Sequence, residues 1–300
     1  MPPDSVIGVD LGGTKILAGT VGRNGAVGRT IEVPTPAEGD AILAEIDWIV
    51  GDLLRDGAAA VGLGVPMPVD PQTGIAFPAA NLPLGEVDIA GRIHDRFGVP
   101  VGIENDANAA ALAEWRLGAG RGTRTLVAFT LGTGVGGGIV LDGRLYRGWA
   151  ELGHIVIEPG GPPCQGSCHG HGHLEALASG LAADRAAREL WGADADAPLL
   201  VQRAAEGDDE AIAAIERIGR YLGLAIGSFV NVFTPDVVVI GGGFGAAAGE
   251  TLLDAARTAA RGEAMAGAAD RLRIVPAALG DEAGLVGAAL VGFEALDGER

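Results

Sequence analysis

Two kinds of apolar segment alternate along this chain of 300 residues. Short runs rich in valine and isoleucine, closed by glycine or an acidic residue, are typical of buried strands. Longer segments with apolar residues at every third or fourth position are typical of helices. Together they predict an α/β fold with partly parallel sheets. Strands are predicted at residues 6–10, 16–21, 29–33, 60–65, 99–104, 125–130, 139–141, 144–146, 237–240 and 273–276, and helices at 41–54, 87–97, 107–117, 181–191, 208–232, 251–261 and 283–293.

The pattern of apolar and polar positions restarts in the second half of the chain. A strand-like run followed by Leu-Gly and a polar turn occupies residues 7–14, and a similar run occupies residues 128–134. Two related α/β halves would explain this internal similarity between the two runs. Two unrelated glycine-turn hairpins would also explain it, because such hairpins share their composition. No linker rich in proline or serine separates the halves, and the chain is expected to cross between them near residues 113–122.

The charge of the chain narrows the classes of partner. Its 39 acidic and 21 basic residues give a net charge of −18, without a local basic patch, so nucleic acid and anionic membranes are not expected to bind it. No apolar run is long enough to suggest a membrane span, and no basic segment precedes the first apolar run as in a secretory signal. The two cysteines are too close in sequence to join distant parts of the fold, so a reducing, cytoplasmic location is expected.

Three glycine-rich turns follow predicted strands, at residues 10–15, 131–138 and 241–245. Backbone N–H groups exposed at such turns can bind phosphate oxygens, so the three together indicate a nucleotide held between two domains. Asp10 is placed to hold Mg²⁺, and Lys15, the single lysine, would add a positive charge near phosphate. The glycine spacing matches neither the P-loop nor the dinucleotide motif, and each turn taken alone is also compatible with an ordinary hairpin.

A polar segment at residues 104–108 lies between a predicted strand and a predicted helix. One interpretation is that Asn105 or Asp106 caps the helix, since both residue types are favoured there. The other is that Asp106 is a general base at the end of a strand, which accepts the proton of an attacking hydroxyl group in phosphoryl transfer.

Both cysteines and four of the five histidines fall between His154 and His173. Thiolates and imidazoles in one short segment suit a tetrahedral zinc ion, whereas the alternative is a flexible polar loop with incidental histidines. Four protein ligands would make the zinc structural instead of catalytic. The natural ligand set is His154, Cys164 and Cys168 with one of His169, His171 or His173.

Taken together, these motifs resemble the ROK family of sugar kinases and sugar-responsive repressors over nearly the whole chain. Within the family, the kinases that act on glucose are the nearest match. The resemblance implies a two-domain, actin-like (ribonuclease H-like) ATPase fold with a sugar-binding cleft between the domains: residues 1–113 with the C-terminal helix 283–300 as the small domain, and 114–282 with the zinc loop as the large one. The matching segments are DLGGTK at 10–15, ENDANAA at 104–110, LGTGVGGG at 131–138, ELGH at 151–154, GHLE at 172–175 and SG at 179–180.

The resemblance also implies an activity, which is ATP- and Mg²⁺-dependent phosphorylation of the 6-hydroxyl group of a hexose, with Asp106 as the base. Glucose is the first candidate, and fructose, mannose and N-acetylhexosamines are alternatives. A homodimer is common in the family. The residues implied at the sugar are Asn81, Asn105, Asp106, Glu151, His154 and Glu175. Those implied at ATP are Asp10, Gly12, Gly13, Thr14, Lys15, Gly132, Thr133, Gly134, Gly242, Gly243 and Phe244.

The chain departs from the family pattern in the zinc loop, which usually reads Cys-x-Cys-Gly-x-x-Gly-Cys-x-Glu. Here Cys168 follows Cys164 by four residues instead of two, and His173 stands in place of the third cysteine. The offsets from His154 to Cys164 and from Cys168 to His173 match the family, which implies these four as ligands, with His169 and His171 as alternatives. Met67 is a second departure, because the family commonly has a small residue there; it leaves the identity of the sugar open.

Two other classes of protein compete with a sugar kinase. Regulators of the family carry a helix-turn-helix ahead of the first glycine motif, and the nine residues before Asp10 are too few for one. An actin-like assembly module would explain the glycine turns but not Glu151, His154 and Glu175 or the cysteine and histidine cluster. Polyphosphate stays an alternative donor to ATP, although the shortage of cations disfavours a long polyanion.

Overall fold

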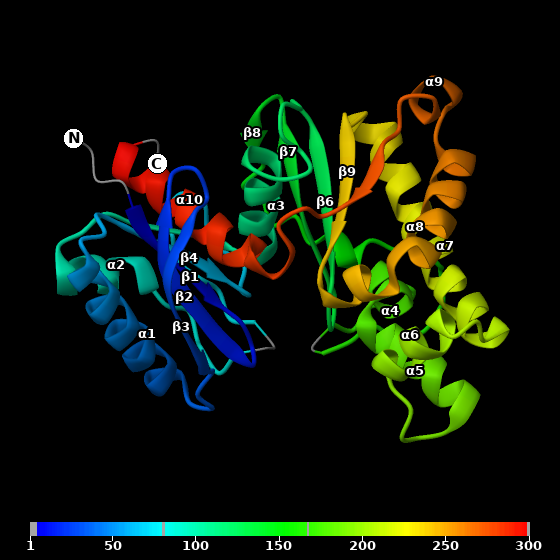
Figure 1. The fold of residues 1–300 in the computed structure, drawn as a ribbon, viewed down its shortest axis with the longest axis horizontal. Coiled ribbons are helices and arrows are strands. Elements are labelled where there is room, and N and C mark those ends of the chain that lie inside the picture. The colour runs from blue at the N-terminus through cyan, green and yellow to red at the C-terminus, as the bar shows by residue number, and fades with distance from the viewer. Residues whose placement is uncertain (1–4, 80–81, 167, 299–300) are drawn as a thin grey trace. The chain divides into compact units, whose positions relative to one another are not determined.

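The computed structural model describes residues 5–79, 82–166 and 168–298 of the chain (Figure 1). Contacts between residues divide the chain into two units, and each unit holds one five-stranded sheet. The first unit comprises Met1–Leu117, Arg147–Trp149 and Glu282–Arg300, and the second comprises Gly118–Tyr146 and Ala150–Asp281. Within the described ranges, no helix has the length and apolar character that a membrane span requires.

The sheet of the first unit joins an antiparallel part to a parallel part. Its strands are β1 (Ser5–Leu11), β2 (Lys15–Gly22), β3 (Val27–Pro34), β4 (Val61–Val65) and β5 (Val101–Asn105). In the order β3-β2-β1-β4-β5, β2 is antiparallel to both its neighbours, whereas β4 is parallel to both of its own. The strands predicted for this part of the chain are therefore confirmed, with ends that differ by a few residues.

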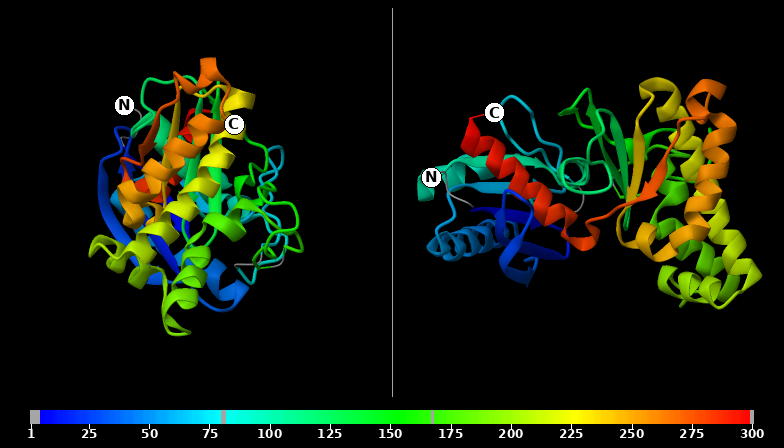
Figure 2. Two further views of the ribbon diagram at one scale, coloured as in Figure 1. Left: turned by 90° about the vertical axis from the view of Figure 1, so that its right-hand side faces the viewer. Right: turned by 45° about the horizontal axis from the view of Figure 1, so that its top comes forward.

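Helices cover both faces of this sheet. They are α1 (Gly39–Leu53), α2 (Ile89–Phe97), α3 (Asp106–Arg116) and α10 (Ala283–Asp297), with 3₁₀ turns at Leu54–Asp56 and Gly280–Glu282. Side chains alternate across a strand, so Ile7 and Val9 of β1 enter the core that α1 and α2 share, whereas Gly8 faces α10. α10 packs along α3 on that second face (Figure 2). α3 begins directly after β5, and the first turn of α10 lies beside the end of β1.

The sheet of the second unit repeats the arrangement of the first. Its strands are β6 (Leu126–Leu131), β7 (Val135–Leu141), β8 (Arg144–Leu145), β9 (Val237–Gly241) and β10 (Ile274–Pro276). The order is β8-β7-β6-β9-β10, with β7 antiparallel and β9 parallel to both of their neighbours. β6 thus has the place that β1 has in the first unit. This confirms, at the level of topology, the two related halves suggested by the internal similarity of the sequence.

Helices of the second unit build a core on one side of its sheet. They are α4 (Leu174–Ala178), α5 (Gly180–Trp191), α6 (Ala197–Ala205), α7 (Asp209–Phe233), α8 (Gly243–Glu263) and α9 (Ala266–Ala269), with a 3₁₀ turn at Leu152–His154. α7 and α8 lie closely against each other (Figure 1). Gly223 of α7 makes this approach achievable, because a Cβ there would come within 2.5 Å of the Ala256 carbonyl oxygen.

The structure corrects two of the sequence predictions in glycine-rich segments. The second glycine turn ends at residue 134, because residues 136–138 belong to β7; a Cβ at Gly137 would come within 2.5 Å of the Ala128 carbonyl oxygen, so the close packing requires glycine there. α8 begins at Gly243 instead of residue 251. Glycine lowers helix propensity, so the pattern concealed its first turns, and Gly249 kinks the helix with a φ of 58°.

Candidate functional site

Asp106 is the first residue of α3, directly after β5. The cap of this helix is Asn105, whose Oδ1 accepts hydrogen bonds from the backbone N–H groups of Ala107 at 3.0 Å and Asn108 at 3.2 Å. Asp106 Oδ1 also accepts from Ala107 N–H, at 2.7 Å, and the residue is half-buried. The helix start is therefore capped by Asn105, and Asp106 is not needed for that role.

The first glycine turn joins β1 to β2 and has a fixed shape. Gly12 N–H donates to the Lys15 carbonyl oxygen at 2.9 Å. Thr35 holds the turn from the outside, because its Oγ1 donates to the Gly12 carbonyl oxygen at 2.7 Å and its N–H donates to the Thr14 carbonyl oxygen at 3.0 Å. Lys15 Nζ donates to Glu32 at 2.8 Å in an exposed ion pair, and Gly13 and Thr14 are also exposed.

Asp10 precedes this turn in β1. Burial raises the pKa of its carboxyl group to about 6, although the positive charge of Lys15 opposes the rise. The carboxylate lies at the first turn of α10, where a Cβ at Gly284 would come within 2.3 Å of Asp10 Oδ2. A hard divalent cation is a favourable partner for a carboxylate that has lost solvent, so the surroundings of Asp10 fit the Mg²⁺ role predicted for it.

A cavity of about 610 Å³ lies within the second unit. Three helices, α5, α6 and α8, contribute residues of their first turns to its wall, and helix N-termini attract anions. Four residues predicted at the nucleotide line it, whereas Gly134 and Gly242 are not among the lining residues. Leu181, Pro198 and Val201 give it an apolar part that suits a planar base. The lining residues predicted from the sequence are Gly132, Thr133, Gly243 and Phe244.

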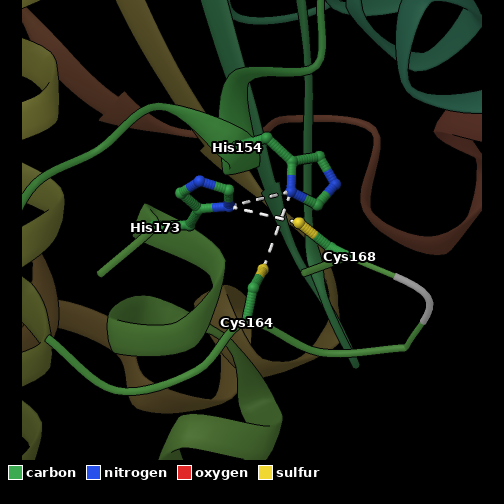
Figure 3. Close-up of side chains that lie close together, drawn as sticks. All are labelled: His154, Cys164, Cys168 and His173. Carbon is green, nitrogen blue, oxygen red and sulfur yellow. Dashed lines mark hydrogen bonds between the residues drawn. The ribbon is translucent and has the colours of Figure 1, made fainter. Parts of the chain in front are cut away.

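The four residues implied as zinc ligands lie together in the second unit (Figure 3). His154 ends the 3₁₀ turn, His173 precedes α4, and the cysteines lie in the loop between them. One potential ligand atom from each lies within 4.8 Å of the other three. The Nδ1 atoms are 3.4 Å apart, and the sulfur atoms of Cys164 and Cys168 lie 3.6 and 3.5 Å from Nδ1 of His154 and His173, respectively.

This geometry fits a tetrahedral zinc ion. Bond lengths of about 2.0–2.1 Å to nitrogen and about 2.3 Å to sulfur place neighbouring ligand atoms about 3.3–3.8 Å apart, with the nitrogen–nitrogen pair nearest. Desolvation raises the pKa of the Cys164 thiol to about 11, so a cation is needed to stabilise its thiolate at neutral pH. His169 and His171 are exposed and do not belong to the cluster found among the described residues.

Glu151 and Glu175, predicted at the sugar, lie near this cluster. Partial desolvation raises the pKa of Glu151. The electrostatic effect of His154 opposes this rise and that of Glu175 adds to it, so the three groups are electrostatic neighbours. Glu175 Oε2 accepts a hydrogen bond from Val135 N–H at 3.0 Å, and its Oε1 lies 3.9 Å from Cys164 Sγ. Glu175 therefore contacts both the metal cluster and the second glycine turn. Asn81 lies outside the described residues.

Sequence reasoning missed an ion-pair network in the first unit, which joins Glu104, Arg147 and Glu294. The buried carboxylate of Glu104 accepts hydrogen bonds from Asn108 Nδ2 and Arg147 Nε, both at 3.2 Å, and Arg147 also pairs with Glu294. Arg147 thereby holds the segment that precedes Glu151 in sequence. An isolated arginine in an irregular segment has no periodic signal, so only its spatial partners reveal it.

The second unit also contains residues that were not predicted as functional. Gln165 Nε2 donates to the Glu175 carbonyl oxygen at 2.9 Å and to Ser179 Oγ at 2.7 Å. Ser179 is fully buried and caps α5, since its Oγ accepts from Ala182 N–H at 3.1 Å. A serine immediately before a helix is a recognised start signal, whereas nothing in the local pattern marks Gln165.

Comparison with known proteins finds sugar kinases that match nearly the whole chain. A glucokinase from Thermotoga maritima is 36% identical over 99% of this chain and 100% of its own length. The crystal structure of a ROK hexokinase from Thermus thermophilus, 38% identical, superposes with a TM-score of 0.86 over 98% of this chain and 99% of that one. A ROK family glucokinase from Streptomyces griseus, 33% identical and solved with glucose and AMPPNP, gives 0.85 over 97% and 99%.

The similarity extends over both units. The two related sheets, each with a glycine turn after its central strand, have the actin-like ATPase fold of these kinases. The model of the ROK family matches residues 6–293. From this match and the full-length similarity to the relatives, the chain belongs to the ROK family.

Proposed function

We propose that this protein is a glucokinase, which transfers the γ-phosphoryl group of ATP to the 6-hydroxyl group of glucose. The full-length similarity to glucokinases, one of them solved with glucose and AMPPNP, supports this activity. The observation that carries it is the cavity of the second unit, where the second glycine turn, the N-terminus of α8 and an apolar wall suit a nucleotide. The first N–H groups of α5 and α6 donate to acceptors within the protein, so these two helices contribute to the wall through their side chains and dipoles.

The proposed chemistry depends on Asp106. Its carboxylate accepts the proton of the 6-hydroxyl group while that oxygen bonds to the γ-phosphorus, and ADP leaves with the bridging oxygen. Asn105 caps α3 through its oxygen, so its amide N–H groups can donate to a sugar hydroxyl. Glucose 6-phosphate and ADP are the products, and the proton passes from Asp106 to solvent.

The residues of the two glycine turns bind the phosphates in this proposal. Gly13 and Thr14 of the first turn and Thr133 and Gly134 of the second would offer backbone N–H groups, whereas the N–H groups of Gly12 and Gly132 donate within their own turns and fix the turn shape. Bound Mg²⁺ neutralises charge on the phosphates, and Asp10 is the residue that would hold it. Lys15 adds a positive charge near the first turn, shared with Glu32. Gly242, Gly243 and Phe244 lie at the nucleoside, at the start of α8.

The sugar is held by hydroxyl contacts in this proposal. The residues proposed to bind it are Asn105, Asp106, Glu151, His154 and Glu175, and Asn81 remains a prediction outside the described residues. The zinc proposed at His154, Cys164, Cys168 and His173 has a structural role, since it fixes the loop that carries these sugar ligands. A cytoplasmic homodimer remains the prediction for location and assembly.

A coupled assay of ADP release across a panel of hexoses tests the activity and the sugar together. Glucose is expected to give the highest kcat/KM, ahead of mannose, fructose and N-acetylglucosamine. Polyphosphate in place of ATP, with glucose 6-phosphate as the measured product, tests the alternative donor. Wild-type protein that turns over none of these hexoses, although it contains zinc and is folded, would contradict the proposal.

A further inference from the structure

The loop that carries the metal cluster is linked by hydrogen bonds to the element beside the nucleotide cavity. Gln165 follows Cys164 directly, and its Nε2 donates both to the Glu175 carbonyl oxygen at 2.9 Å and to Ser179 Oγ at 2.7 Å. Its Oε1 is buried and has no hydrogen-bond partner among the described residues. Such an orphan acceptor costs stability, so the two bonds of Nε2 are made at the expense of an unsatisfied atom in the same side chain.

Both partners of Gln165 hold the second glycine turn. Ser179 precedes Gly180, whose N–H donates to the Gly132 carbonyl oxygen at 2.7 Å, and Leu181 N–H donates to the Thr133 carbonyl oxygen at 3.4 Å. Glu175 Oε2 accepts from Val135 N–H at 3.0 Å on the other side of the turn. A shift of residues 175–179 would therefore move the turn at both of its ends.

The position of Gln165 depends in turn on the metal cluster. Cys164 precedes it and Cys168 follows three residues later, so a cation bound by both cysteines fixes the backbone on each side of Gln165. Residues that orient metal ligands, or are oriented by them, change properties well beyond the metal itself. The path from the cluster to the cavity wall is thus short: the metal loop, one glutamine side chain, and the cap of α5.

We propose that Gln165 is a positioning residue that couples the Cys/His cluster to the second glycine turn, so that nucleotide affinity depends on the loaded metal loop. The proposal rests on the nucleotide role assigned to the cavity under the proposed function. It goes further, because it assigns to the metal loop an influence on ATP binding that is separate from its support of the sugar ligands. Replacing Gln165 is expected to weaken nucleotide binding more than sugar binding, because Glu175, a proposed sugar ligand, loses only a contact at its carbonyl oxygen, and metal content should be retained.

Gln165→Glu and Gln165→Leu both remove the Nε2 donor, and Gln72→Leu, at an exposed loop position of the first unit, is the matched control. Calorimetry with AMPPNP and with glucose gives the two affinities, and elemental analysis gives zinc per chain. Both Gln165 variants are expected to bind AMPPNP about tenfold more weakly, the scale of one or two lost hydrogen bonds, with a clearly smaller loss of glucose affinity, about threefold at most. The Gln72 variant should match the wild type throughout.

A double-mutant cycle with Ser179→Ala adds an independent measure of coupling. If Gln165 acts through Ser179, the loss of AMPPNP affinity caused by Gln165→Leu should be smaller in the Ser179→Ala background. Unchanged AMPPNP affinity in both Gln165 variants, with zinc retained, overturns the proposal. Equal loss of glucose and AMPPNP affinity also overturns it, because that outcome describes general destabilisation.

Hydrogen exchange tests the coupling without any ligand, so its result does not depend on whether the proposed kinase function is correct. Wild-type protein that binds neither glucose nor AMPPNP would refute the kinase assignment, but the exchange of backbone amides at residues 132–135 needs no ligand. Metal removal by a chelator should increase exchange there, and Gln165→Leu with zinc bound should reproduce part of the increase. Exchange that is unaffected by both changes refutes the coupling itself.

Discussion

The carboxylate of Asp10 lies so close to Gly284 that a Cβ on the glycine would come within 2.3 Å of Oδ2. Gly284→Ala should therefore displace the carboxylate, while alanine improves the helix propensity of α10 by about 0.5–1 kcal/mol. We expect kcat/KM to fall at least about tenfold with little loss of thermal stability, a split that a coupled assay and a melting curve resolve.

Gly262→Ala is the control for this change, because Gly262 is also helical but has no atom within 4 Å of an added Cβ. Its activity should equal that of the wild type. Equal activity in the Gly284 variant would contradict the role of Asp10 at the reacting phosphates.

The raised pKa of Asp10 has a predictable effect on stability in the absence of Mg²⁺. Its ordinary value of 3.8 rises to about 6 in the folded protein, so the folded state holds the proton more tightly. The stabilisation of the folded state by this tighter proton binding is fully present below pH 4 and is lost as the pH rises through 6. At pH 7.5, Asp10→Asn should be more stable than the wild type by on the order of 1–3 kcal/mol. Urea unfolding of both proteins at pH 4 and 7.5 measures this difference, which should shrink at the lower pH.

Neighbouring residues at the start of α3 should separate capping from chemistry. Asn105→Ala removes the cap and should lower the free energy of unfolding by about 1 kcal/mol. Asp106→Asn should leave the free energy of unfolding nearly unchanged but abolish most turnover, with glucose binding still measurable by calorimetry. Near-normal turnover in the Asp106 variant would rule it out as the base.

Metal content should depend on His154, Cys164, Cys168 and His173, and not on His169 or His171. Cys168→Ser is expected to reduce zinc in protein purified without added metal from about one to well below one per chain, and to lower the melting temperature. His171→Ala serves as the control, since His171 is exposed and outside the cluster. Zinc loss in the His171 variant with retention in the Cys168 variant would reverse the ligand assignment.

Arg147 should matter for stability through Glu104, whose side chain is only 7% exposed. Arg147→Met removes the arginine from that carboxylate and from Glu294, and should cost about 2–4 kcal/mol in the free energy of unfolding. The double variant Arg147→Met with Glu104→Gln should recover part of this loss, because the buried charge of Glu104 is removed together with its arginine, whereas Glu294 still loses Arg147. Guanidinium unfolding of the two single variants and the double variant measures the coupling, and additive losses would argue against a direct pair.

Much of the fold was predictable because its strands are continuous runs of valine and isoleucine and its glycine turns follow them directly. The first turns of α8 were concealed, since glycine and alanine from residue 241 onward carry no apolar period and their helix is stabilised by packing on β6. The site was predictable where residue types are chemically distinctive, as for the cysteine and histidine cluster. Gln165 and Arg147 were missed because their roles depend on partners that only the folded chain brings near.

β1 and β6 occupy equivalent places in the two sheets, and each is followed by a glycine turn, but the residues around the two turns differ. Aligning the two Leu-Gly pairs places Asp10 of the first copy opposite Thr130 of the second. The carboxylate suited to a cation is thus present in one copy, whereas the large apolar cavity is found in the other. In the proposed function, Asp10 at the first of these turns would hold Mg²⁺ and the second turn would lie at the nucleotide, so exchanging Asp10 and Thr130 between the copies would not be a neutral swap.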